Sequence, residues 1–209
     1  FSNGIMSEKA QVMQAMPQPL VILHFNDVYN IDEQQKEPVG GAARFASMIK
    51  SLNDPLVLFS GDAFNPSTLS TVTKGKQMPP ILNAFGVKVA CIGNHDFDHG
   101  LEPLAGLLES CDFPWLLSNV FDADTGLPLG GAMETHVLDW QGRRIGLMGL
   151  VEPDWMATLA AIEEDAIKYV DFVEQGTRLA EELRGKGCDF IIALTHMRVP
   201  NDLLLAENV

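Results

Sequence analysis

The sequence predicts a layered α/β domain with a mixed sheet, and two observations carry this prediction. Short apolar runs alternate along the chain with segments whose apolar residues recur at spacings of three and four. The first pattern is typical of buried strands, and the second of helices with one buried face. A hairpin pattern between residues 137 and 150 adds an antiparallel pair, so we expect the sheet to be mixed.

The first half of the chain alternates strand and helix patterns. Strands are expected at residues 20–24, 56–60, 87–92 and 115–117. Helices are expected at residues 42–52, 79–85 and 101–110. The helix at 42–52 carries an apolar stripe that begins at Phe45, and Pro79-Pro80 opens the next one.

The second half begins with the hairpin pattern. Residues 137–140 and 145–150 flank a turn that contains Gly142. Apolar spacing then predicts a helix over residues 165–184, which Gly185 and Gly187 would end. A last strand is expected at residues 190–194.

Size and composition set the domain organisation. The chain has 209 residues, of which 46% are hydrophobic and 20% charged, enough to build one sizeable core. We expect residues 1–19, rich in Gln and Met, to form an N-terminal arm and residues 20–209 to form the domain. No apolar run reaches the ~18 residues that a membrane span needs.

The charge balance restricts the possible partners. There are 14 basic and 28 acidic residues, which gives a net charge of −14. This argues against binding of a nucleic-acid backbone, which needs clustered Lys and Arg, and permits divalent cations. Cys91, Cys111 and Cys188 are widely spaced and odd in number, so we expect small buried residues rather than a disulfide framework. The absence of a recognisable export signal leads us to expect a cytoplasmic protein.

Polar side chains follow four of the expected strands where each strand ends. They are Asp27, Asp62, the pair Asn94-His95, and His196. The carboxyl ends of strands line the ligand crevice in open α/β sheets, so these side chains should converge. A single Asp after a strand is usually a cap or turn residue, but capping explains four successive strand ends poorly.

This set of residue types suits a metal centre. Two carboxylates, an amide oxygen and an imidazole are a plausible mixed ligand set for divalent transition metals. A carboxylate can also bridge two ions, which lie ~3.5–4 Å apart in two-metal hydrolases of phosphate esters.

The same residues carry a resemblance to a known family. Asn26-Asp27, Gly61-Asp62, the run Gly93 to Asp96, and Thr195-His196 resemble the successive motifs of the calcineurin-like metallophosphoesterases. The surrounding sequence, including Gly40-Gly41, is similar to the 5′-nucleotidase and UDP-sugar hydrolase branch. The resemblance implies an α/β/β/α sandwich with mixed sheets, and two divalent metal ions (manganese, zinc, magnesium or iron).

The resemblance also implies a role for each matching residue. Asp27 would bind the first metal and Asp62 would bridge both. Asn94 would bind the second metal and contact the phosphate, and His196 would bind the second metal.

His95 would stabilise the transition state or protonate the leaving oxygen, and Asp98 would orient His95. A carboxylate partner fixes the tautomer of an imidazole, which agrees with this pairing. The alternative for Asp98 is a cap of the following helix.

Other residues near the motifs are weaker candidates. Arg198 and Arg44 could steady a phosphate group, although surface solvation or pairing with a carboxylate is the alternative for each. We expect His24 and His99 to be structural, and Phe64 and Trp155 to be packing residues.

Two features depart from the family pattern. Where the family usually has Asp-x-His, this chain has Asp27-Val28-Tyr29, so Tyr29 is either a phenolate ligand or a wall residue. The family's last motif, Gly-His-x-His, does not occur before Val209. We therefore expect the metal site and the sandwich to be incomplete within these residues, the C-terminal substrate-binding domain to be absent, and the activity of residues 1–209 alone to be weak.

Two functions are compatible with these features of the sequence. The first is a hydrolase in which metal-activated water attacks a phosphate monoester or nucleotide. The second is a weak or inactive family member that serves as a structural or interaction module in a larger assembly. A dinucleotide-binding domain is a poor alternative, because no Gly-x-Gly-x-x-Gly follows the first strand.

Overall fold

The structure is a computed structural model that describes residues 19–159 and 162–209. The arm expected at residues 1–19 therefore lies, except for its last residue, outside the described residues. The strands are β1 (Ile22–Phe25), β2 (Leu56–Ser60), β3 (Val89–Cys91), β4 (Trp115–Leu116), β5 (Val120–Asp122), β6 (Thr135–Trp140), β7 (Arg143–Val151), β8 (Ile167–Tyr169) and β9 (Phe190–His196). The α-helices are α2 (Ala42–Ser51), α3 (Thr68–Thr73), α4 (Met78–Phe85), α5 (Leu101–Glu109), α6 (Phe172–Gly185) and α7 (Val199–Asn208).

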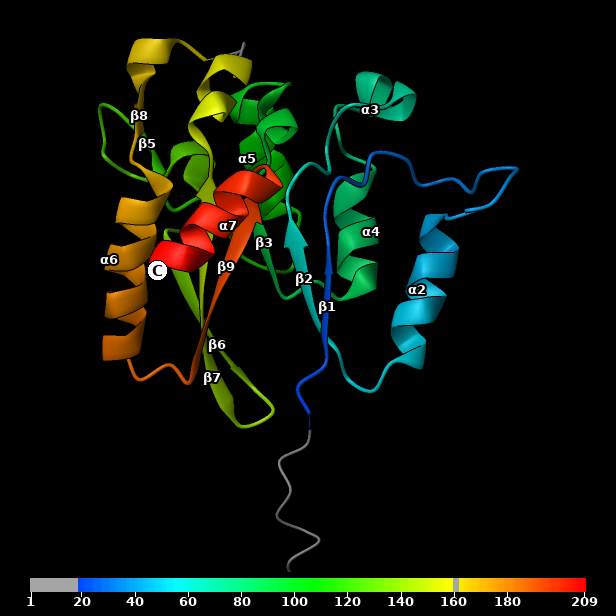
Figure 1. The fold of residues 1–209 in the computed structure, drawn as a ribbon. Coiled ribbons are helices and arrows are strands. Elements are labelled where there is room, and N and C mark those ends of the chain that lie inside the picture. Colours follow the sequence, from blue (N-terminus) through cyan, green and yellow to red (C-terminus); the bar gives the residue numbers. More distant parts are fainter. Residues whose placement is uncertain (1–18, 160–161) are drawn as a thin grey trace, which may run out of the picture.

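Two sheets pack face to face in the middle of the domain. The first has the order β1-β2-β3-β4 and is parallel throughout. The second has the order β6-β7-β9, in which β6 runs antiparallel and β9 parallel to β7. Helix α6 lies on one side of this pair of sheets, and α2 and α4 lie on the other (Figure 1). The expected layered α/β fold with mixed strand directions is confirmed.

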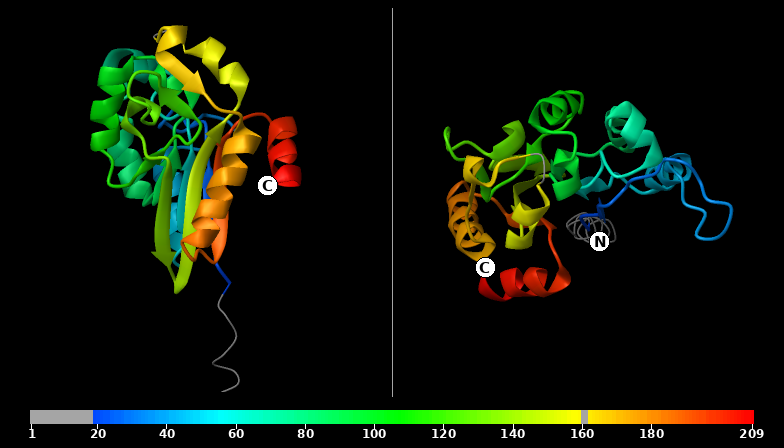
Figure 2. Two further views of the ribbon diagram at one scale, coloured as in Figure 1. Left: turned by 90° about the vertical axis from the view of Figure 1, so that its left-hand side faces the viewer. Right: turned by 90° about the horizontal axis from the view of Figure 1, so that it is seen from above.

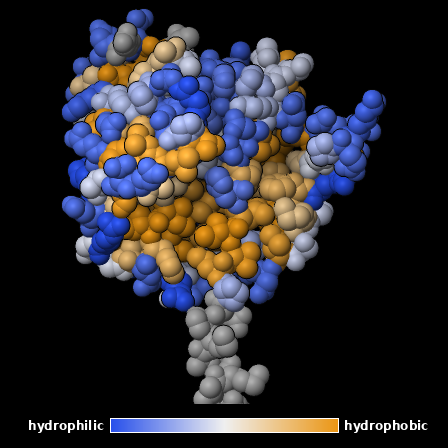
Figure 3. All heavy atoms as spheres, viewed as in Figure 1, coloured by the Kyte–Doolittle hydropathy of each residue, from blue (hydrophilic) through white to orange (hydrophobic). Residues whose placement is uncertain are grey.

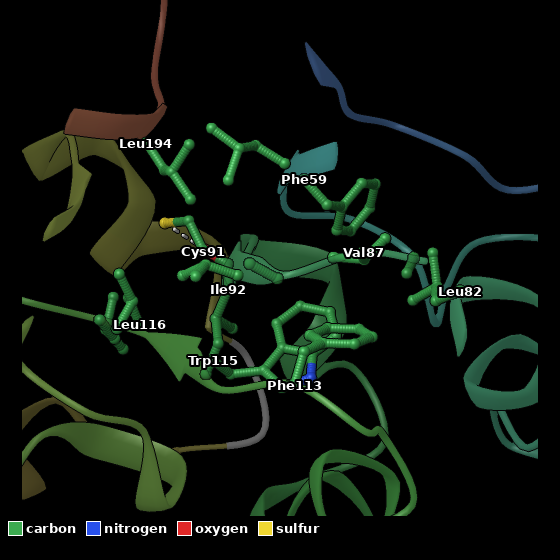
Figure 4. Close-up of a cluster of buried hydrophobic side chains, with 14 of the residues drawn as sticks. Phe59, Leu82, Val87, Cys91, Ile92, Phe113, Trp115, Leu116 and Leu194 are labelled. Carbon is green, nitrogen blue, oxygen red and sulfur yellow. Dashed lines mark hydrogen bonds between the residues drawn. The ribbon is translucent and has the colours of Figure 1, made fainter. Parts of the chain in front are cut away.

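The core fills the space between the two sheets and beneath the helices. Strands β2 and β3 are buried along their whole length, as parallel strands covered on both faces must be. Figure 4 shows how Phe59, Cys91 and Leu194 of three different strands meet in this core. Phe64 and Trp155 are also buried, as expected of packing residues.

A buried polar junction joins the two sheets. Ser118 and Asn119 follow β4, and both are fully buried. The Ser118 hydroxyl accepts a hydrogen bond from the Gly149 N–H at 2.7 Å. The Asn119 amide donates to the Val151 carbonyl and accepts from the Val151 N–H. These bonds pair backbone groups of β7 that its hydrogen bonds to neighbouring strands leave unpaired. The polar residues that follow β4 therefore have a structural role.

One expectation about a helix was wrong. The segment expected to be a helix over residues 165–184 contains strand β8, and α6 begins only at Phe172. Asp171 sets this boundary, because its carboxylate accepts from the N–H groups of Val173 and Glu174 and caps the helix. Apolar spacing alone could not place that boundary, because β8 pairs with distant β5.

The first strand is also less buried than its apolar composition suggested. β1 pairs only with β2 among the described strands, and Ile22 is 45% exposed. β9 likewise has one neighbour, β7, at the margin of its sheet. Figure 3 shows an apolar area on the face of the molecule that carries β1 and β9. Figure 2 shows α7, in red, on the outside of the second sheet. Among the described residues, no helix is both long and apolar enough to cross a bilayer.

The close approach of the sheets predicts an intolerance to side chains at Gly149. A Cβ atom there would lie 2.8 Å from the Leu116 Cβ and 3.0 Å from the Cys91 Sγ. We expect Gly149→Ala to lower the free energy of unfolding by about 1–3 kcal/mol, since an overpacked core must shift. Chemical denaturation measures this.

Gly106→Ala in α5 is the matched control, because a Cβ atom on Gly106 would have no neighbour within 4 Å. We expect it to be neutral or to stabilise by about 0.5–1 kcal/mol, as Ala does in a helix. Equal effects of the two substitutions would contradict this account of the sheet packing.

Candidate metal centre

Two aspartates occupy equivalent positions after neighbouring strands. Asp27 follows β1 with φ 55°, and Asp62 follows β2 with φ 63°. This left-handed conformation is unusual outside glycine, although Asp tolerates it better than most residues. The Asp27 N–H donates to the Gly61 carbonyl, and the Val28 N–H donates to the Asp62 carbonyl. The two turns therefore run side by side and bring their carboxylates together.

Glycines allow a third turn to approach these two. A Cβ atom on Gly61 would lie 2.5 Å from the Gly93 nitrogen, and one on Gly93 would lie 2.2 Å from Asp62 Oδ1. Neither position has room for a side chain, and Gly61 also has a φ of 87°. The close approach lets the His95 N–H donate to Asp62 Oδ1 at 2.9 Å.

The Asp96 carboxylate holds these turns in place. It is buried and accepts hydrogen bonds of 2.8–3.0 Å from the backbone N–H groups of Asp62, Ala63, Phe64 and Gly93. Burial and the charge of Asp62 raise the pKa of Asp96 to about 6, while the backbone N–H donors lower it. This one carboxylate therefore fixes the turn after β2 against the turn after β3.

His196 reaches the same place from the end of β9. Its Nδ1–H donates to the Ser60 carbonyl at 2.7 Å, because a carbonyl can only accept. Its Nε2 then points to the Asp62 and Asn94 side-chain oxygens, at 3.3 and 3.2 Å. This is the arrangement of metal-binding histidines, whose second ring nitrogen is held by a carbonyl or carboxylate.

The arrangement brings several electron-pair donors together. Asp27, Asp62 and His196 each offer a ligand atom, and these atoms lie within 4.8 Å of one another. A neutral His196 would direct the lone pair of Nε2 at two oxygen atoms, an arrangement that a cation between them would relieve. Burial lowers the pKa of His196, but the hydrogen bond and charge of Asp62 outweigh this and raise it to about 9. Without a metal ion, a proton fills this need.

Tyr29 lies between the two aspartates. Its Oη is 2.7 Å from Asp27 Oδ1 and 2.9 Å from Asp62 Oδ2. Burial, then the hydrogen bond to Asp27 and the charge of Asp62, raise the pKa of Tyr29 far above its ordinary value. The phenol therefore stays protonated in this arrangement and donates to a carboxylate.

His95 and Asp98 form a pair beside the three turns. His95 Nδ1 donates to Asp98 Oδ2 at 2.9 Å, and the Asn65 amide donates to the same carboxylate oxygen at 2.6 Å. Asp98 does not cap the following helix, because the N-cap of α5 is Gly100. The side chain of His95 is 41% exposed.

The two candidate arginines lie in different places. Arg198 lines a pocket of about 220 Å³ together with Asp27, Asn94 and His196. Arg44 lines a separate pocket beside α2, with Phe25 and the Gly40-Gly41 turn. Arg198 pairs with Glu152 and Asp154, as one alternative anticipated.

Two carboxylates were not assigned their structural place from the sequence. Asp96 entered the sequence analysis only as the last residue of the run Gly93 to Asp96, yet it accepts hydrogen bonds from four backbone groups. Glu152 was not singled out, although it directly follows β7, and the rule of polar residues at strand ends could have found it.

His24 hydrogen-bonds to the Ser60 hydroxyl at 2.8 Å, next to the carbonyl that holds His196.

Comparison with known proteins agrees with this fold. Residues 20–208 match the calcineurin-like phosphoesterase family. The chain is 36% identical over 212 residues to a 5′-nucleotidase of Bos taurus, covering 93% of this chain and 37% of that protein. It is 27% identical to a probable 5′-nucleotidase of Treponema pallidum, covering 91% of this chain and 34% of that protein.

A solved structure leads to the same family. The 5′-nucleotidase precursor from Thermus thermophilus superposes with a TM-score of 0.78 at 28% identity, covering 90% of this chain and 39% of that one. The fold and the convergent acid–histidine cluster define a phosphoesterase domain of the metal-dependent class. The chain belongs to the calcineurin-like phosphoesterase family, in which divalent metal binding is general. It spans about a third of the length of the relatives it matches.

The role of Asp96 in ordering the turns is testable. We expect Asp96→Asn to lower the free energy of unfolding by about 2–3 kcal/mol, because an amide turns its N–H₂ group toward backbone donors and leaves them unsatisfied. Urea denaturation measures this. Asp124→Asn, the same change at an exposed position, is the control and should have little effect. A nearly neutral Asp96→Asn would contradict the role of the Asp96 carboxylate in holding the turns.

Proposed function

We propose that this chain is the metal-binding domain of a metal-dependent hydrolase that cleaves a phosphate monoester or nucleotide, as its 5′-nucleotidase relatives suggest. The observation that carries the proposal is the convergence of Asp27, Asp62 and His196 at the carboxyl ends of β1, β2 and β9. A divalent cation satisfies all three donors at once.

The metal centre we propose holds two divalent ions. Asp62 would bridge them, Asp27 would bind one, and Asn94 and His196 would bind the other. The donor chemistry supports this, since His196 Nε2 and Asn94 Oδ1 face the Asp62 carboxylate. The ions would supply positive charge that lowers the pKa of water and offsets the charge of the phosphate. Manganese, zinc, magnesium and iron are the candidates.

The chain's own residues provide the remaining chemistry. Asn94 would contact a phosphate oxygen through its amide. His95 would donate a proton from Nε2 to the leaving oxygen, and Asp98 would hold the ring through Nδ1. The exposure of His95 and the burial of Asp62 fit this division between a group that meets substrate and one that binds metal.

Tyr29 is assigned as a wall residue of this centre. Its Oη lies within hydrogen-bond distance of both aspartates, and its single proton can be donated to one of them at a time. It also favours the second function, a weakly catalytic or inactive module, because a phenol that occupies both carboxylates competes with metal for them. Metal binding separates the two functions.

Loss of the bridging charge tests the proposal. We expect Asp62→Asn to weaken Mn²⁺ binding to the chain and, in a protein that hydrolyses nucleotides, to lower turnover at least about a hundredfold. Isothermal titration calorimetry measures the first effect and release of phosphate from 5′-AMP the second. Circular dichroism checks that the fold is retained. Unchanged Mn²⁺ affinity and turnover would rule out the bridging role.

His95 should behave differently from the metal-binding residues. We expect His95→Ala to lower turnover by about 10²–10⁴, the usual contribution of general acid catalysis, and to leave the Mn²⁺ stoichiometry unchanged. Metal analysis after gel filtration, in parallel with the phosphate assay, measures both. His136→Ala, which changes a partly buried histidine on β6, is the control. Loss of a metal ion from the His95 variant would instead make His95 a ligand.

A further inference from the structure

The pocket beside the metal centre has one wall that the proposed chemistry does not use. Asp27, Asn94 and His196 line one part of the pocket, and Glu152, Trp155 and Arg198 line another. Its volume of about 220 Å³ is below the ~300–1,000 Å³ of pockets for larger ligands, so it suits a compact group.

Arg198 is held in this wall by one nearly buried carboxylate. Its Nε donates to Glu152 Oε1 at 2.8 Å, and its backbone N–H donates to Glu152 Oε2 at 3.1 Å. Asn201 fixes that same oxygen through a hydrogen bond of 2.6 Å. Asp154 accepts from Nη2 on the outer side. The side chain of Glu152 is 11% exposed and that of Arg198 is 61% exposed. A nearly buried carboxylate therefore holds a guanidinium that is open to solvent.

The anchoring leaves most of the guanidinium available to a ligand. Arg has five N–H donors, and its hydrogen bonds to the described residues engage Nε and Nη2 but not Nη1. Those remaining donors can bind two oxygens of a phosphate group in the bidentate manner typical of Arg. An ion pair this exposed contributes little to stability, so packing alone explains the network poorly.

Arg198 is also the group of this wall that can attract an anion. Apart from His196, Arg198 is the only basic side chain among the described residues that line the pocket, and its neighbours there include Asp27 and Glu152. Without Arg198, Glu152 would place an unpaired negative charge beside an incoming phosphate. Arg198 offsets one of the two negative charges of Glu152 and Asp154, so the attraction of a phosphate to this wall rests on direct contact with the guanidinium and on the positive charge of the neighbouring metal ions.

We propose that Arg198 binds the phosphate group of the substrate, and that Glu152 and Asp154 are positioning residues that orient its guanidinium. This rests on the proposed function, because the phosphate is placed by the neighbouring metal centre. Arg198 and His95 approach that phosphate from different elements, the end of β9 and the turn after β3.

Binding of inorganic phosphate to the 209-residue chain in saturating Mn²⁺ tests this without any turnover. Calorimetry gives the Mn²⁺ affinity first and the phosphate affinity second. We expect Arg198→Met to raise the Kd for phosphate at least about tenfold. We expect Arg198→Lys to raise it less, because an ammonium group keeps the charge attraction but cannot donate two parallel hydrogen bonds as a guanidinium does. Mn²⁺ affinity should stay within about threefold of wild type in both.

The matched control is Arg144→Met, which removes an exposed arginine that also pairs with an aspartate, at 3.8 Å, but lies outside the pocket. It should leave the phosphate Kd unchanged. The double variant Glu152→Gln/Arg198→Met removes the carboxylate that Arg198→Met leaves unpaired. Phosphate binding should stay weak in the double variant.

Other results for phosphate and Mn²⁺ binding would refute particular parts of the proposal. A phosphate Kd of Arg198→Met within twofold of wild type would contradict contact between Arg198 and phosphate. Recovery of affinity in the double variant would assign the effect to repulsion by Glu152 instead. If the wild-type chain binds no Mn²⁺, the metal centre proposed for these residues fails, and this inference fails with it. If the chain binds Mn²⁺ but no phosphate, the metal centre stands and only the phosphate site is refuted.

Discussion

The four hydrogen bonds to Asp96 are the interaction on which the candidate site depends. They join the turn after β2 to the turn after β3 through one buried carboxylate. The strands themselves cannot fix the side chains that follow them, because the ladder ends at Ser60 and Cys91. Asp96 continues that order beyond the sheet and sets the backbone of Asp62 in its left-handed conformation. The same turns need Gly61 and Gly93 to come close enough.

The second constraint is electrostatic. A fold that collects Asp27, Asp62, Asn94 and the Nε2 of His196 places electron-pair donors against one another. Such an arrangement is costly unless a cation lies among them, and the hydrogen bond from His196 Nδ1 to the Ser60 carbonyl prevents the ring from turning Nε2 away. The backbone therefore enforces the need for a metal ion or a proton. The neighbouring wall of the pocket shows the same pairing of opposite charges, because the nearly buried Glu152 carboxylate accepts a hydrogen bond from the Arg198 guanidinium.

The convergence of the strand-end residues could be predicted from the sequence because it follows from topology. Parallel strands end at the same edge, so Asp27, Asp62 and Asn94 had to meet once their strands were recognised. The strand-end rule also included His196, although His196 follows β9 of the second sheet, so its place depends on how the two sheets pack and not on a shared sheet edge. The helix boundary at Phe172 was missed because β8 is defined by its pairing with β5, a contact distant in sequence. The part played by Asp96 could not be foreseen either, since an acidic residue in a turn carries no sign of which backbone groups it will accept from.

In the proposed metal centre, His196 and the aspartates bind a divalent cation. Pulsed electron paramagnetic resonance of the Mn²⁺-loaded chain tests it most directly, because a directly bound imidazole nitrogen modulates the manganese signal. We predict that the wild-type chain shows this nitrogen coupling, that His196→Ala loses it, and that His24→Ala, which changes the neighbouring histidine bonded to Ser60, keeps it. Bound Mn²⁺ without nitrogen coupling, or coupling that survives in His196→Ala, would show that His196 is not the imidazole ligand of the ion.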